Sequence, residues 1–303
     1  MTELAAPATN GLPYGVPPPG YRLPAGTTLG PVTLQVAELT RSLDYYERVL
    51  GLRVLGGSPR TATLGTQDGT TPLVVLQERP GATPVPRRGR LGLYHFALLL
   101  PDRAALGSFV RHLADANVYA GMSDHLVSEA VYLTDPDGLG IEVYADRPLG
   151  GWRHEGGQLV MATNPLDVQD LLRAAGDERW SGMPAGSRLG HVHLFVGDLE
   201  AASGFYHTAL GFDKVVWSYP GALFLSAGGY HHHLGTNTWA AGAEPAGEGD
   251  ARLLEWEIRV PSVEDARAAL ESLRGAGVAA EQADDGGVAH DPWGTAVRVR
   301  PVP

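Results

Sequence analysis

The chain has 303 residues, 44% of them hydrophobic, with 23 basic and 34 acidic side chains and a formal net charge of −11. This length and composition are sufficient for two domains with buried cores, and they exclude the disordered and fibrous classes. The sequence has no cysteine, which excludes disulfides, thiolate metal sites and cysteine nucleophiles. A tight metal site must therefore use His, Asp or Glu.

The acidic residues are spread along the chain, which argues against nucleic acid or an anionic membrane as a partner. The only basic cluster is Arg87-Arg88-Gly89-Arg90, which we interpret as a solvated loop. No apolar run approaches the roughly 20 residues that a membrane span needs, and the N-terminus lacks the features of a signal peptide. We expect a cytoplasmic protein that binds neither nucleic acid nor membrane.

The predicted elements begin after a proline-rich arm, residues 1–28, which includes Pro7 and Pro13. Alternating apolar residues from Val32 predict a strand, and a short helix from Ser42 to Leu50 follows. Two of the three strands expected next are placed at 61–64 and 73–77. A second module repeats this order, with a strand at 93–100, a helix at 103–116, and strands at 130–133 and 140–144 around a turn at 135–138.

The second half of the chain repeats the first half. The segment Leu29–Leu34 recurs 160 residues later at Leu189–Leu194, with Pro31 replaced by His191. Strands are predicted at 192–196, 223–226, 231–234, 254–260 and 296–299, with helices at 201–210 and 263–275. Between the copies, Asn164-Pro165 opens a helix predicted at 166–175. A repeat of this length indicates a duplicated domain.

The pattern is therefore β-α-β-β-β four times over. At this point the chain resembles the vicinal oxygen chelate superfamily of glyoxalases, fosfomycin and bleomycin resistance proteins and extradiol dioxygenases. The resemblance is carried by Leu189-Gly190-His191-Val192 with Asp198, and by the run Asp135–Glu142. Within the superfamily, Tyr144–Pro148 and Tyr230–Trp239 resemble catechol-2,3-dioxygenase-like proteins most.

This resemblance implies an α+β fold in which four βαβββ modules form two tandem open-barrel domains. We place a metal-free N-terminal domain at residues 29–148, a linker with a short helix at 149–187, and a C-terminal domain with the metal site at 188–303. In the N-terminal copy Pro31 cannot bind a metal, so that site is expected to have decayed. His95 and Glu142 are interpreted there as structural residues.

In such folds the first and last strands of each module point side chains at one metal. The C-terminal copy then offers His191, His233 and Glu255 as ligands, while Arg298 stays protonated and cannot ligate. Strand alternation would place His231 on the same face as His233, which makes His231 and His193 alternative ligands or acid–base groups. The alternative for Glu255 is an ion pair with Arg259.

Two histidines and one carboxylate form the facial triad of non-haem Fe(II) oxygenases. The resemblance thus implies an Fe(II)-dependent extradiol dioxygenase, with Mn(II) as the alternative metal, that cleaves a catechol-type diol with O2. We expect His231 or His193 to take the diol proton. The residues expected to line the substrate pocket are Tyr219, Tyr230, Trp239 and His290.

Two other functions fit the same fold. A glyoxalase-type isomerase or lyase would bind Zn or Ni and would not use dioxygen. A non-catalytic resistance protein would hold a ligand without turnover and would not require His191 or Glu255. A homo-oligomer is the default expectation, because exposed sheet edges in such modules pair between chains.

Overall fold

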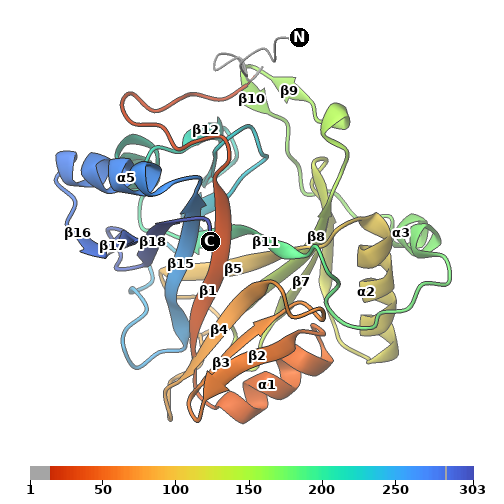
Figure 1. Ribbon diagram of the computed structural model, residues 1–303. Coiled ribbons are helices and arrows are strands. Elements are labelled where there is room, and N and C mark those ends of the chain that lie inside the picture. Colours follow the sequence, from red (N-terminus) through yellow and green to blue (C-terminus); the bar gives the residue numbers. More distant parts are fainter. Residues whose placement is uncertain (1–13, 284) are drawn as a thin grey trace, which may run out of the picture.

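A computed structural model describes residues 14–283 and 285–303 (Figure 1). The beginning of the predicted N-terminal arm, including Pro7 and Pro13, lies outside the described residues. The described part of the arm lies against the body of the protein. Arg22 pairs with Asp213 through two hydrogen bonds of 2.8 and 2.7 Å, and the backbone N–H of Leu23 donates to Gly211.

Each half of the chain contains two modules with the predicted order of strand, helix and three strands. Module one consists of β1 Thr28–Val36, α1 Leu39–Arg48, β2 Arg53–Ser58, β3 Thr61–Gly65 and β4 Pro72–Glu78. Module two consists of β5 Gly92–Leu99, α2 Arg103–Asp115, β6 Gly121–Asp124, β7 Ser128–Thr134 and β8 Gly140–Asp146. The fold class predicted from the sequence is confirmed.

The second half repeats this order with one local difference in its first helix. Module three consists of β11 Arg188–Phe195, α4 Leu199–Ala202, η2 Ser203–Ala209, β12 Asp213–Val216, β13 Ala222–Ser226 and β14 Leu234–Asn237. Module four consists of β15 Arg252–Val260, α5 Val263–Gly275, β16 Ala280–Ala283, β17 Gly286–His290 and β18 Ala296–Pro301. The helix expected at 201–210 is therefore a short α-helix that continues as the π-helix η2.

The eighteen strands of the described chain include two curled sheets of eight strands each. One sheet has the order β16-β17-β18-β15-β1-β4-β3-β2, and the other has the order β12-β13-β14-β11-β5-β8-β7-β6. Modules one and four thus form one sheet, and modules two and three form the other. We expected each copy of the repeat to close its own barrel, but the modules pair across the copies. Residues 29–148 and 188–303 each contain half of both sheets.

The strand pairing repeats with the 160-residue offset of the sequence. In one sheet β1 runs antiparallel to β15 and Thr33 faces Glu255, while in the other β11 runs antiparallel to β5 and His193 faces His95. Residues that the sequence aligns between the two copies therefore occupy equivalent positions in the structure. The alignment relates the two sheets to each other, because each sheet contains strands from both copies.

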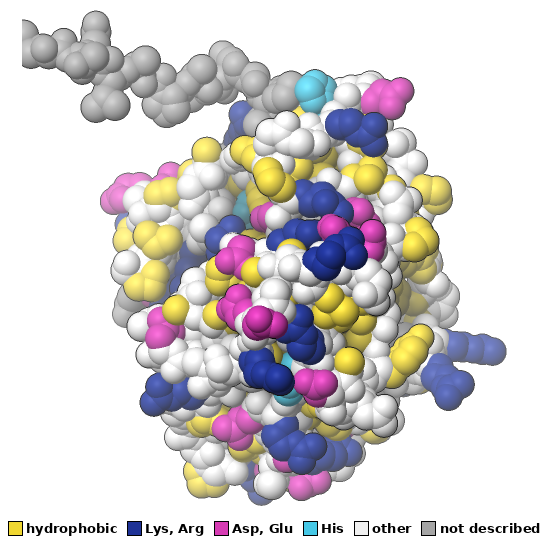
Figure 2. Space-filling view, turned by 90° about the vertical axis from the view of Figure 1, so that its right-hand side faces the viewer, with side chains coloured by type: hydrophobic (Ala, Val, Ile, Leu, Met, Phe, Trp, Pro, Cys, Tyr) yellow, Lys and Arg dark blue, Asp and Glu magenta, His cyan; other side chains and the backbone are white. Residues whose placement is uncertain are grey.

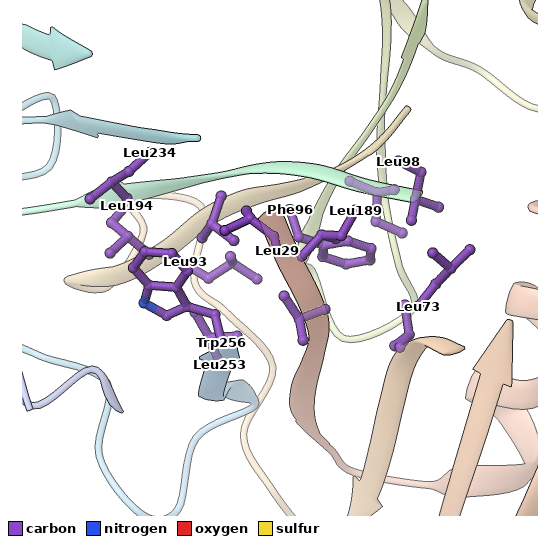
Figure 3. Packing of buried hydrophobic residues seen from close by; sticks show 14 of the residues in the cluster. Leu29, Leu73, Leu93, Phe96, Leu98, Leu189, Leu194, Leu234, Leu253 and Trp256 are labelled. Atoms are coloured by element: carbon purple, nitrogen blue, oxygen red, sulfur yellow. The ribbon is translucent and has the colours of Figure 1, made fainter. Parts of the chain in front are cut away.

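The largest hydrophobic core lies where the two sheets and their helices meet (Figure 3). Phe96 from one sheet and Trp256 from the other are fully buried there, together with leucines of β1, β4, β5, β11, β14 and β15. Burying one such side chain contributes about 1.5–3 kcal/mol. This shared core fixes the relative position of the sheets and therefore of the strands that carry the site.

The linker is ordered and docks on module two. It contains η1 Leu149–Gly151, β9 His154–Glu155, β10 Gln158–Leu159 and α3 Val168–Ala175, the last close to the predicted helix. α3 packs on α2 beside Gly107, where an added Cβ would lie 2.4 Å from the carbonyl oxygen of Leu171 (Figure 1). This close approach requires glycine at position 107.

Charged side chains of both signs are mixed over the face drawn in Figure 2, with no large field of one sign. None of the helices in the described residues combines the length and the hydropathy that crossing a membrane requires.

Candidate metal centre

Three neighbouring strands bring two histidines and a carboxylate together inside the second sheet. His95 is on β5, Glu142 on β8 and His191 on β11, and their ligand atoms lie within 4.8 Å of one another. The Nε2 atoms of His95 and His191 lie 3.0 and 3.2 Å from the same carboxylate oxygen, Oε2 of Glu142. All three side chains are at most 6% exposed.

The strand register explains this convergence. Ala97 of β5 pairs with His191 on the neighbouring strand β11 and with Glu142 on the neighbouring strand β8. His95 lies two residues before Ala97 and therefore points to the same face of the sheet. Ala97 is fully buried and its side chain is a single methyl group, so the three longer side chains meet above it. The site is thus specified by register and by one small residue.

The donor atoms fit a metal ion. Adjacent ligand atoms of an octahedral ion with bonds of about 2.1 Å lie about 3 Å apart, as Glu142 and the two histidines do. Neither ring nitrogen of buried His95 has a hydrogen-bond partner among the described residues, so its 3.0 Å approach to Glu142 lacks hydrogen-bond alignment. An ion bound at Nε2 would satisfy this otherwise costly buried group.

The protonation states suit ligation as well. Burial lowers the pKa of His191 to about 4, against the smaller opposing effect of Glu142, so its imidazole is neutral at neutral pH. Burial by itself would raise the pKa of Glu142, but His191 and His95 outweigh it and hold that pKa well below the ordinary value. Metal ions bind neutral imidazole and ionised carboxylate.

The three residues open into a cavity of about 360 Å³. Aromatic and apolar side chains form much of its wall, including Tyr219, Phe224 and Trp239, and linker residues 161–163 close one side. The remaining polar lining residues include His125, Tyr132, His193 and His232. The linker was expected to contain a short helix, and its part in the cavity was not predicted.

A hydrogen-bonded chain ends at the cavity in His232. Asp146 Oδ1 accepts from Nε2 of His231 at 2.9 Å, because a carboxylate only accepts. With both rings neutral, Nδ1 of His231 then accepts from Nδ1 of His232 at 2.7 Å. Nε2 of His232 is left as a proton-free nitrogen on the residue that lines the cavity, and the His232 ring lies 4.1 Å from that of His191.

His193 has its own fixed orientation. The backbone N–H of Trp239 donates to Oδ1 of Asn237 at 3.0 Å, so the amide nitrogen of Asn237 is the atom that lies 3.0 Å from Nε2 of His193. Nε2 of His193 therefore accepts a hydrogen bond, and Nδ1 carries the proton of the neutral ring. Burial lowers the pKa of His193 well below its ordinary value.

Of the predicted metal ligands, the structure brings only His191 into the metal-binding group. His233 is buried elsewhere, where Nδ1 accepts from the backbone N–H of Ala227 at 3.2 Å. The strand predicted at 231–234 was wrong: β14 begins at Leu234, after a turn with positive φ at Gly228 and Gly229. His231 and His233 thus do not alternate along a strand.

Glu255 belongs to the other sheet, where it forms two hydrogen bonds of 2.7 and 2.8 Å with Arg298. The alternative partner considered for it, Arg259, instead pairs with Glu257 at 2.5 Å. Register places the pair Glu255–Arg298 where His95 and Glu142 stand in the metal-binding sheet. The positions equivalent to the candidate site are thus occupied by Pro31 of the first copy and by Glu255 and Arg298 of the second.

The predicted pocket residues divide in two. Tyr219 and Trp239 line the cavity. Tyr230 instead donates to Asp146 at 3.1 Å, and His290 is exposed at the end of β17 in the other sheet. Among the predicted acid–base residues, His193 lines the cavity and His231 lies behind His232.

The sequence did not lead us to predict His95 and Glu142 as candidate ligands, or His232, His125 and Tyr132 as lining residues. The signal for the first two was present, because they occupy the aligned ligand positions of module two. The prediction combined module three with module four, whereas module three shares its sheet with module two. The position of His232 depends on the turn before β14, and that of His125 on its hydrogen bonds to Ala162 and Tyr132, which no sequence pattern indicates.

The fold and the site define a protein of the vicinal oxygen chelate type. The profile of the Glyoxalase/Bleomycin resistance protein/Dioxygenase superfamily matches residues 28–143 and 188–298, and the chain belongs to this superfamily. It is similar to the catechol-2,3-dioxygenase of Bacillus subtilis (strain 168), with 43% identity over 270 residues that cover 88% of this chain and 94% of the relative.

Solved structures show the same fold at low sequence identity. A putative dioxygenase from Bacillus subtilis is similar with a TM-score of 0.62 and 15% identity, covering 93% of this chain and 87% of that one. Glyoxalase I from Zea mays has a TM-score of 0.55 and 18% identity, covering 91% and 92%. At these identities the likeness concerns the fold alone.

Proposed function

We propose that the protein is an Fe(II)-dependent extradiol dioxygenase that cleaves a catechol-type diol with O2. The observation that carries the proposal is the buried group of two histidines and one carboxylate, His95, Glu142 and His191, which is the ligand set of non-haem Fe(II) oxygenases. The 43% identity to a catechol-2,3-dioxygenase supports it. Mn(II) suits the same ligands.

When bound, the ion would bind a diol and dioxygen and would lower the pKa of the diol hydroxyls. The part of the chain is to hold the ion from one face of the sheet. His95, Glu142 and His191 come from three adjacent strands, so their spacing is fixed by backbone hydrogen bonds and not by a mobile loop. These three side chains would hold the ion beside the cavity, into which the reactants would bind.

The cavity wall would orient the aromatic ring of the substrate. Tyr219 and Phe224 present aromatic surface, with their ring centroids 5.8 Å apart, and Met161 adds an apolar contact. A flat ring enclosed by these side chains is shielded from water, which strengthens polar interactions at its hydroxyl groups. The aromatic lining thus supports a small aromatic substrate.

Two histidines would hold the polar edge of that ring. Nε2 of His232 is placed to accept a hydrogen bond from a substrate hydroxyl, because the chain from Asp146 through His231 fixes its tautomer. His193 would donate from Nδ1, since Asn237 occupies Nε2. His231 acts here through His232, and a direct proton transfer to His231 or His193 stays a prediction.

The test is anaerobic loading with Fe(II), followed by catechol and air. We expect oxygen uptake matched to catechol consumption and a yellow ring-opened product, both abolished in Glu142→Gln. Absence of both for several substituted catechols would refute the dioxygenase. Oxygen-independent isomerase activity with Zn(II) or Ni(II) would instead identify a glyoxalase-type enzyme.

A further inference from the structure

The metal-site cavity adjoins a second, wider cleft. The cleft has a volume of about 1200 Å³ and shares four lining residues with the cavity: Tyr94, His95, Tyr132 and Trp239. The inner cavity alone falls within the range of pockets that enclose a drug-sized ligand. The combined space is therefore much larger than a single catechol ring requires.

The charges along this cleft are of one sign. The residues that line it include Arg87 and Arg88 but no aspartate or glutamate, in a chain whose net charge is −11. Both arginines are exposed, and within residues 14–283 and 285–303 no salt bridge involves either of them. Neighbouring Arg90, in contrast, pairs with Asp250 at 3.5 Å.

The two arginines stand on a well-anchored turn. The backbone N–H of Gly89 donates to Pro86 at 2.8 Å, with φ of +76° at Gly89, so Arg87 and Arg88 occupy the two central positions of a tight turn. The backbone N–H groups of Val85 and Leu91, on either side, donate to Asp137 and Glu244 at 2.8 and 3.1 Å. The sequence suggested a solvated loop, and these backbone hydrogen bonds fix both ends of that loop beside the cleft.

Aromatic residues line the cleft beside this turn, since a Cβ added at Gly89 would lie 3.1 Å from the ring of Phe195. Phe195 and Trp239 line the cleft, and the Tyr94 ring lies 4.7 and 5.7 Å from theirs. Tyr119 and Trp239 are 94% and 52% exposed, although large aromatic side chains usually bury most of their surface. An apolar spacer attached to the substrate ring would cover these rings on its way to the arginines.

We propose that the preferred substrate is a catechol whose side chain ends in a carboxylate, with Arg87 and Arg88 as the specificity-determining residues that bind that carboxylate. This inference rests on the proposed function, and it specifies the substituent on the catechol ring of the substrate. Arginine suits this task because its planar guanidinium pairs with a carboxylate through two parallel hydrogen bonds.

The test compares two catechols that differ only at the end of the side chain, a propanoate and the matching propanamide. In the Fe(II)-loaded wild type we expect a lower KM for the acid. In R87A/R88A the KM of the acid should rise about tenfold, as for the loss of charge-assisted hydrogen bonds worth about 1.4 kcal/mol, while kcat and the KM of the amide stay unchanged. R87K/R88K should retain part of the preference.

The matched control is R60A/R267A, which removes two positive charges at exposed positions that do not line the cleft. It should leave the KM of the acid unchanged. The inference is overturned if the wild type has the same KM for the acid and the amide, or if R60A/R267A raises the KM of the acid as much as R87A/R88A does.

A binding measurement separates this inference from the dioxygenase proposal. Calorimetry of phenylpropanoate and phenylpropanamide with the metal-free protein needs neither hydroxyls nor turnover. If no catechol is cleaved but the acid binds more tightly than the amide in an Arg87- and Arg88-dependent manner, the proposed function fails and the carboxylate site stands. Equal binding of both compounds, with catechols cleaved normally, rejects the carboxylate site alone.

Discussion

Ala97 shows how a single residue position defines the candidate metal site. It lies between His191 on one neighbouring strand and Glu142 on the other, and its small side chain leaves the space in which the ligands meet. Its counterpart in the other sheet is Glu257, which lies opposite Arg298 and binds Arg259 and Arg300. Equivalent strand positions thus hold a candidate metal-ligand set in one sheet and ion pairs in the other.

The first prediction separates the two possible ligand carboxylates. Glu142→Gln keeps the shape of the side chain but removes the negative charge, so affinity for Fe(II) should fall at least about tenfold. Glu255→Gln should bind metal like the wild type, because Glu255 pairs with Arg298 in the other sheet. Metal content after equilibration with Fe(II) checks both variants, and loss of metal in Glu255→Gln would contradict the assignment.

The second prediction concerns pH and the buried turn at 135–138. Burial raises the pKa of Asp135 to about 7, with a smaller contribution from Asp137. Since the folded protein then holds this proton more tightly than the unfolded chain, the stabilising contribution is present below about pH 4 and is lost as pH rises to 7.

Asp135→Asn provides the comparison, because an amide can still accept from the N–H groups of Asp137 and Leu139. Relative to this variant, the wild type should lose up to about 1.4 kcal/mol of unfolding free energy for each pH unit between 4 and 7. Urea unfolding at several pH values measures the difference. A constant difference would exclude the shifted pKa.

At the scale of elements, local sequence patterns placed most strands and helices close to their observed positions. The helix at 263–275 and the strand at 296–299 follow directly from apolar periodicity and agree with α5 and β18. The histidine run failed because Gly228 and Gly229 form a turn, which removes His231–His233 from the strand. Periodicity reports burial within an element, and it does not report where a glycine-rich turn ends.

The packing of α3 on α2 gives the third prediction. Gly107→Ala would force a methyl group to within 2.4 Å of the carbonyl oxygen of Leu171, so the helices must separate at a cost of about 1–3 kcal/mol. Because residues 161–163 of the same linker line the cavity, limited proteolysis should cut the linker faster in this variant. Gly150→Ala, with open space around it, is the matched control.

At the scale of the whole molecule, the sequence revealed the duplication and its offset, but not which modules share a sheet. The choice is between pairing β5 with β1 of its own half and pairing it with β11 of the other half. β1 and β11 carry nearly the same pattern, so periodicity cannot distinguish them. The pairing joins residues far apart in the chain, such as those of β5 and β11, and a pattern within one strand does not report it.

The fourth prediction follows from this pairing. Residues 29–148 and 188–303, produced separately, each lack the partner strands of both sheets and would expose unpaired edges. Neither half should fold as a monomer, whereas co-expression of both should give a folded complex. Circular dichroism and size-exclusion chromatography test this, and a cooperatively unfolding monomeric half would contradict it.

Pairing across the copies also bears on how such a chain arises. Two identical half-chains joined in this manner would form a symmetric dimer with two equal sites. Fusion into one gene allows each site to mutate independently, since a change in one copy no longer affects both. The Glu255–Arg298 pair and the His95–Glu142–His191 group are the two descendants expected from that freedom. The fused protein would then retain one candidate metal centre where a symmetric ancestor would have carried two.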